Sequence, residues 1–214
     1  CSVPGIDTAG ASFPSAIVEA YRRNMLPALL KRIDGYFVAA VYDAGKGRIV
    51  LISDRYGLKP LYVARQNGLF AWSSEIKGFF TCAEFEKKVV KDALECFLGL
   101  GHFTGDMTWF DGVTMMSPST MLVYDIESGG IAETVRYWKW SDIERSPMTF
   151  DEAVEALAPI LKRSVARRIS PGERIGLALT GGLDSRAMLG SLEDPSAVIA
   201  YTFGREGSWD VVIA

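Results

Sequence analysis

The spacing of apolar residues changes twice along the chain, and these changes limit the folds available to it. Apolar residues recur at helical spacing from Ser15 to about Arg32, where Pro27 should kink or end the helix. Short β-branched and aromatic runs follow, separated by glycine-rich turns, and they predict four sequential strands in one antiparallel sheet: 36–42, 48–53, 60–64 and 69–73. A second helix and three more strands are predicted at 89–100, 112–115, 120–125 and 134–138. The first part of the chain is therefore predicted to combine helices with antiparallel strands.

A second type of pattern begins after a predicted linker, Lys139 to Met148. Thr149 and Glu152 form a potential capping box, which indicates the start of a helix. A buried strand, a helix, a second buried strand and the opening of another helix are then predicted at 174–179, 184–191, 197–203 and 208–214. Strand, turn, helix and strand in this order are typical of a parallel βαβ unit.

Composition excludes several classes of protein. The 214 residues are 49% hydrophobic with a net charge of −3, which argues against disorder and against general attraction to nucleic acid or anionic membranes. We expect neither as a partner. No apolar run is long enough for a membrane helix. The three cysteines match no disulfide or metal spacing, which favours the cytoplasm, and the single histidine excludes multi-histidine metal sites.

The strongest functional pattern is Thr-Gly-Gly-Leu-Asp-Ser at residues 180–185, here called the glycine turn. It lies between a predicted strand and a predicted helix, where backbone N–H groups and hydroxyls can face one small anion. It matches neither the P-loop nor the dinucleotide-binding pattern. The alternative is a plain turn that caps the helix. The residues expected to hold phosphate are Thr180, Gly181, Gly182, Asp184 and Ser185.

The glycine turn resembles the pyrophosphate loop of ATP-pyrophosphatases, in the form found in glutamine-hydrolysing asparagine synthetases. Thr180 replaces the usual serine and keeps the hydroxyl. The resemblance to this family extends over most of the chain from about Ser15, through segments 34–37, 54–62, 73–77, 116–119, 136–138, 201–204 and 207–210.

The resemblance implies two domains. Residues 1–140 would form a glutamine amidotransferase domain, an α+β N-terminal-nucleophile (αββα) sandwich. Residues 149–214 would begin an α/β parallel-sheet ATP-pyrophosphatase domain, which adenylates a carboxylate, with aspartate as the default, using ATP and Mg²⁺. Glutamine would supply the ammonia that displaces AMP. The resemblance is also compatible with a homodimer.

The resemblance also implies roles for individual residues. Cys1, with Gly5 and Ile6, is similar to the family's opening and would be the glutaminase nucleophile, with its own α-amino group as the base. Asp184 would approach Mg²⁺. Leu179 and Phe203, at the ends of two strands, would contact the adenine, although both residue types more often serve the core.

Departures from the family keep alternatives open. Between Gly5 and Ser15 the sequence has no arginine and no Asn-Gly-Glu segment, which the family uses to bind glutamine. We expect a segment to be missing after about residue 6 and further residues to follow Ala214. A glutamine-independent adenylating cyclase of the β-lactam synthetase type and a non-catalytic shortened homologue are the competing hypotheses.

Overall fold

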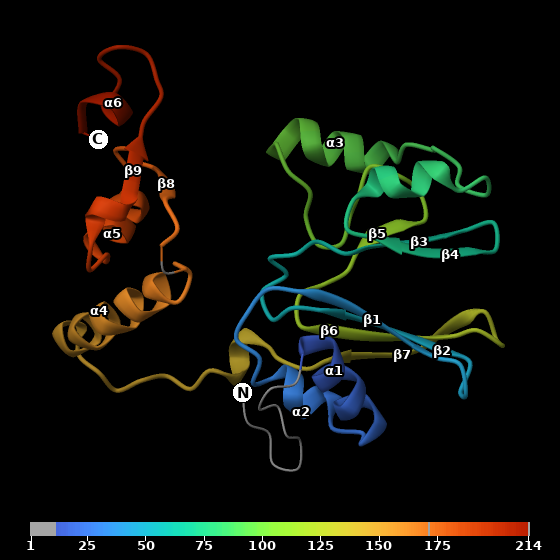
Figure 1. The fold of residues 1–214 in the computed structure, drawn as a ribbon. Coiled ribbons are helices and arrows are strands. Elements are labelled where there is room, and N and C mark those ends of the chain that lie inside the picture. The colour runs from blue at the N-terminus through green and yellow to red at the C-terminus, as the bar shows by residue number, and fades with distance from the viewer. Residues whose placement is uncertain (1–11, 171, 214) are drawn as a thin grey trace. The chain divides into compact units, whose positions relative to one another are not determined.

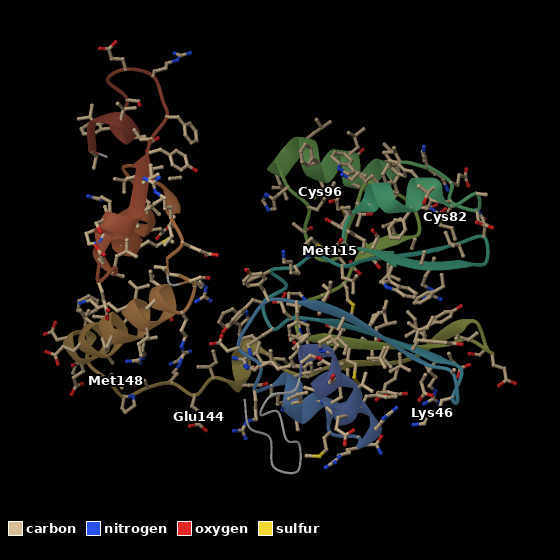
Figure 2. The ribbon with its side chains drawn as sticks, viewed as in Figure 1. Lys46, Cys82, Cys96, Met115, Glu144 and Met148 are labelled. Carbon is tan, nitrogen blue, oxygen red and sulfur yellow. The ribbon has the colours of Figure 1, made fainter. Side chains whose placement is uncertain are left out.

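The computed structural model describes residues 12–170 and 172–213. The chain divides into two compact units, Cys1–Glu144 and Arg145–Ala214, and we describe each by itself. The boundary, between Glu144 and Arg145, falls within the predicted linker, in which Glu144 and Met148 are labelled in Figure 2.

The first unit has four layers (Figure 1). Two helices cover a four-stranded antiparallel sheet of order β1-β2-β6-β7, and a third helix and a 3₁₀ helix cover a three-stranded antiparallel sheet of order β4-β3-β5. This is the expected αββα order. The elements are α1 Phe13–Arg22, α2 Leu26–Leu30, β1 Val38–Asp43, β2 Arg48–Ser53, β3 Tyr62–Gln66, β4 Leu69–Ser73, η1 Ile76–Thr81, α3 Lys91–Leu100, β5 Val113–Met115, β6 Thr120–Asp125, β7 Gly130–Arg136 and η2 Trp140–Asp142.

The prediction that the first four strands share one sheet is wrong. β1 and β2 form one hairpin and β3 and β4 another, but each hairpin pairs with later strands in a different sheet. The apolar pattern marks the strands correctly without stating which strands pair. The segment between β2 and β3 therefore carries the chain from one sheet to the other.

The first helix ends earlier than Pro27. Asn24 adopts a left-handed conformation with φ of 56°, and the Met25 amide donates to the Ala20 carbonyl at 2.8 Å, which closes the helix end. Pro27 then lies in the first turn of α2, where its missing N–H costs nothing. The proline starts a helix here and does not break one.

Apolar side chains fill all three interfaces between the layers. The cluster under α1 and α2 includes Ile17, Leu29 and Val50. The cluster between the two sheets includes Leu51, Val63 and Leu122, and Phe70 stacks on Tyr124 there with ring centroids 3.7 Å apart. A further cluster, around Phe79, Phe85 and Val113, lies on the other side of the smaller sheet.

The second unit contains the predicted parallel pair. β8 and β9 pair in parallel, from Ile175 opposite Val198 to Ala178 opposite Tyr201. Thr149 caps the first helix and forms the complete capping box with Glu152, as predicted. The elements are α4 Phe150–Ala166, β8 Ile175–Ala178, α5 Leu183–Gly190, η3 Pro195–Ala197, β9 Val198–Tyr201 and α6 Trp209–Ile213.

No helix in the ranges 12–170 and 172–213 is long and apolar enough to cross a membrane. In the same ranges, no three His, Cys, Asp or Glu side chains gather into a group that could hold a metal ion.

Candidate nucleotide-binding loop

The glycine turn lies at the carboxyl end of β8. The Leu179 amide donates to the Tyr201 carbonyl at 2.8 Å, so the pairing with β9 continues to the start of the turn. Gly182 caps α5 in an extended conformation, and the helix begins at Leu183. Because open parallel sheets bind ligands at the carboxyl ends of their strands, the turn occupies the expected position for a ligand.

Two hydroxyl groups close the turn. The Thr180 amide donates to the Ser185 Oγ at 3.1 Å, and the Gly182 amide donates to the Thr180 Oγ1 at 3.2 Å. The two hydroxyl oxygens lie 3.3 Å apart. The sequence predicts that both hydroxyls donate hydrogen bonds to a ligand. In the structure they also accept backbone hydrogen bonds, which stabilise the shape of the turn.

The two glycines are needed for space and not for torsion angles. Neither Gly181 nor Gly182 has a positive φ. A Cβ on Gly181 would lie 3.2 Å from the Trp209 carbonyl oxygen, and a Cβ on Gly182 would lie 3.2 Å from the Thr180 Oγ1. The absence of side chains therefore lets the start of α6 approach the turn closely.

Asp210 brings a negatively charged oxygen to the turn. Its Oδ1 accepts a hydrogen bond from the Gly181 amide at 3.1 Å, across 29 residues of sequence. The Asp210 side chain is exposed. The turn thus already holds an anionic oxygen on a backbone N–H group, which is the interaction that a phosphate oxygen would make.

The other predicted site residues differ in their surroundings. Asp184 is exposed in the first turn of α5, Leu179 is buried, and Phe203 is 78% exposed. Cys1 lies outside the described residues. The Arg186 Nε donates to the Gly182 carbonyl at 3.2 Å, a contact that was not predicted from the sequence. The position of a basic residue directly after the glycine turn could have indicated it.

In the first unit, the buried carboxylate of Asp54 stabilises a loop within segment 54–62, one of the segments that resemble the family. Asp54 has no exposed surface and accepts three backbone hydrogen bonds at 3.0–3.1 Å, from Tyr56, Leu58 and Lys59. These bonds fold residues 54–59 into a compact turn between the two sheets. Asp54 is therefore a structural residue.

Two other segments that resemble the family, 116–119 and 136–138, are hydrogen-bonded to this loop or to each other. The Ser119 amide donates to the Asp54 carbonyl at 2.8 Å, and the Tyr137 amide donates to the Ser119 carbonyl at 2.9 Å. The Tyr137 hydroxyl donates to the Ser53 carbonyl at 2.7 Å, and burial raises the pKa of this phenol, which keeps it protonated. These motifs stabilise the first unit.

Comparison with known proteins agrees with this architecture. A profile of the glutamine amidotransferase domain family matches residues 8–138, which is more than half of the chain. The chain belongs to the glutamine amidotransferase domain family.

Individual relatives extend the comparison. A provisionally named glutamine-hydrolysing asparagine synthetase 2 of Methanocaldococcus jannaschii is 28% identical over 188 residues, covering 85% of this chain and 36% of that protein. The asparagine synthetase 3 of Bacillus subtilis is 27% identical over 82% of this chain and 27% of that protein. The asparagine synthetase of Rattus norvegicus is 25% identical over 92% of this chain and 36% of that protein. The chain spans about a third of the length of these relatives.

Proposed function

We propose that this chain takes part in ATP-dependent amide formation of the asparagine synthetase type. Ammonia from glutamine would amidate a carboxylate, aspartate by default, that has first been adenylated. The observation that carries the proposal is the glycine turn at the end of β8, with an anionic oxygen held on the Gly181 amide.

The relatives support a nucleotide-binding role for the second unit. The first unit ends at Glu144, so a match covering 85% of the chain also includes part of the second unit. The relative concerned bears the name of an asparagine synthetase. The proposed ATP-pyrophosphatase role of residues 149–214 rests on this match and on the turn.

The turn's own residues suit a pyrophosphate group. The Gly181 and Gly182 amides and the hydroxyls of Thr180 and Ser185 are hydrogen-bond donors on one short loop. ATP, when bound, supplies the adenylyl group that activates the carboxylate. Leu179 and Phe203 would flank the adenine from the ends of β8 and β9.

Asp184 would be a ligand of Mg²⁺. It is exposed beside the turn, and Mg²⁺ is commonly held by one or two carboxylates together with phosphates and water. A single protein carboxylate is therefore enough for the proposed role.

Cys1 would be the glutaminase nucleophile, on the strength of its resemblance to the family's opening. Loss of glutamine hydrolysis in Cys1→Ala would support this assignment. The competing cyclase hypothesis is favoured by the absence of an Asn-Gly-Glu segment between Gly5 and Ser15. Aspartate-independent ATP–pyrophosphate exchange in a protein that hydrolyses no glutamine would favour that hypothesis.

Titration of the chain with ATP and Mg²⁺ tests the nucleotide site. Gly181→Val should weaken ATP binding by about tenfold or more, because the new side chain meets the Trp209 carbonyl and displaces the loop. Gly190→Ala is the matched control, since a Cβ there has no neighbour within 4 Å. Absence of ATP binding, or equal affinity in the two variants, would contradict the proposal.

A further inference from the structure

The first three amides of the glycine turn already have acceptors in the structure. The Thr180 and Gly182 amides donate to neighbouring hydroxyls, those of Ser185 and of Thr180 itself. The Gly181 amide differs, because its acceptor, the Asp210 Oδ1, belongs to a separate segment. A backbone amide has a single N–H group to donate. A phosphate oxygen can therefore take this N–H group only when Asp210 leaves it.

The segment that carries Asp210 is short and has little packing. α6 has five residues, and none of them is buried. In the described part of the second unit, both hydrogen bonds that join α6 to the segments after β8 and β9 involve Asp210. One comes from the Gly181 amide, and the other runs from the Thr202 hydroxyl to the Asp210 carbonyl at 3.5 Å. Asp210 is therefore the main polar attachment of α6.

The loop between β9 and α6 contains two glycines about which the segment can turn. Figure 1 shows this loop leaving β9 and returning to α6. Gly207 adopts a left-handed conformation with φ of 78°. A Cβ on Gly204 would lie 2.8 Å from the Ser208 Oγ, so the loop and the start of α6 approach closely because Gly204 has no side chain. Glycines at such positions can absorb the backbone rotation of a hinge.

The hydroxyl of Ser208, the residue before α6, is buried and has no hydrogen-bond partner among the described residues. A serine directly before a helix ordinarily accepts a hydrogen bond from an amide of the first turn. Here the Val211 amide, one of the usual donors, donates to the Ser208 carbonyl at 3.0 Å. A buried polar group without a partner destabilises the conformation that buries it. The observed position of α6 is thus favoured by the Asp210 contact and opposed by this hydroxyl.

We propose that residues 208–213, here called the lid, regulate access to the glycine turn. The Asp210 carboxylate occupies the place of a phosphate oxygen until a ligand that carries pyrophosphate displaces it. This inference rests on the proposed nucleotide site. Displacement exchanges one anionic oxygen for another on the Gly181 amide and lets water reach the Ser208 hydroxyl. Repulsion between the phosphate and the Asp210 carboxylate assists the opening.

Trp209 reports the movement of the lid, because it is the first residue of α6 and its side chain is 78% exposed. Titration of the whole chain with inorganic pyrophosphate should change the tryptophan fluorescence, and this change should disappear in Trp209→Phe. Trp140→Phe is the matched control, since Trp140 is 69% exposed in the first unit, and it should keep the change. Titration calorimetry should give the same pyrophosphate affinity for both variants.

Ser208→Ala tests the balance between the two positions of the lid. It removes the unpaired hydroxyl, stabilises the observed position and should weaken pyrophosphate binding about fivefold. Ser196→Ala, at an exposed serine, is the control and should leave the affinity unchanged. In Asp210→Ala the lid is already released, so pyrophosphate should bind more tightly than to the parent. Adding Ser208→Ala to Asp210→Ala should then change little.

The lid and the nucleotide site are overturned by different results. The lid is wrong and the site stands if pyrophosphate binds without a change in Trp209 fluorescence. The same holds if Asp210→Ala binds pyrophosphate more weakly than the parent, or if Ser208→Ala binds it as tightly as the parent. Absence of pyrophosphate binding in both the parent and Asp210→Ala overturns the proposed function, and the lid with it. Binding to Asp210→Ala alone supports both.

Discussion

The two units hold a carboxylate against loop amides in contrasting ways. Asp54 in the first unit is buried and accepts three backbone hydrogen bonds from its own loop. Asp210 in the second unit is exposed and accepts one, from the Gly181 amide of a distant loop. The first carboxylate is inaccessible to solvent, whereas the second is accessible, and we propose that another anion can replace it.

The burial of the surrounding residues follows the same division. The first unit has three apolar clusters, but among the described residues of the second unit only Leu179 and Ser191 are buried. Hydroxyl and amide hydrogen bonds, more than packing, define the glycine turn. We therefore expect the enclosed Asp54 carboxylate to serve stability, and the accessible Asp210 carboxylate to lie where the proposed nucleotide phosphate would bind.

Asp54→Ala should have the largest effect. Removing the buried acceptor leaves three amides without a partner, and we expect the first unit to lose about 3 kcal/mol of unfolding free energy. Urea unfolding followed by tryptophan fluorescence measures this loss. Asp54→Asn keeps one acceptor oxygen and should lose less. A loss below that of a surface substitution such as Glu127→Gln, at an exposed acid, would remove the distinction between the two carboxylates.

Asp210→Asn should have a moderate effect of the opposite kind. The charged competitor for the Gly181 amide is removed, so inorganic pyrophosphate should bind severalfold more tightly, equivalent to about 1 kcal/mol or less. Titration calorimetry measures the affinity. Glu206→Gln, an exposed acid in the preceding loop, is the control and should change little. Weaker pyrophosphate binding in Asp210→Asn would mean that Asp210 is part of the site and does not compete for it.

The smallest effect is expected when Asp43 loses a hydrogen bond. The burial of Asp43 is intermediate between that of the buried Asp54 and that of the exposed Asp210. The Asp43 Oδ2 accepts from the Tyr21 hydroxyl at 2.8 Å and its Oδ1 from the Lys46 amide at 3.1 Å. The Tyr21 hydrogen bond lowers the pKa of the Asp43 carboxyl below its usual 3.8. A lowered pKa adds stability above the unfolded-state pKa, and this stability is lost as the pH falls through the folded-state pKa.

Tyr21→Phe should therefore lower the unfolding free energy at neutral pH, and the difference from the parent should shrink below pH 3.8. Urea unfolding at a series of pH values measures the difference. A difference that is constant down to the most acidic value would show that the lost contact is apolar packing of the ring.

Sequence reasoning identified most elements of both units but misjudged their assembly. The capping box at Thr149 and the strand-turn-helix order around residues 180–185 depend on neighbours a few positions away, and both are present. The single-sheet prediction failed because two hairpins with the same local pattern pair with different later strands. The reason for glycine at position 181 was also missed, since its close neighbour is Trp209.

The sequence by itself determined the features that depend on short range: the periodicities, the turns, the hydroxyls beside the two glycines, and the family resemblance that the domain match bears out in the first unit. Only the tertiary structure decided which distant groups meet. It placed the Asp210 carboxylate on the Gly181 amide and the Ser119 amide on the Asp54 carbonyl. The physical reason is that strand register and loop packing act between residues far apart in the chain, where no local pattern specifies the partner.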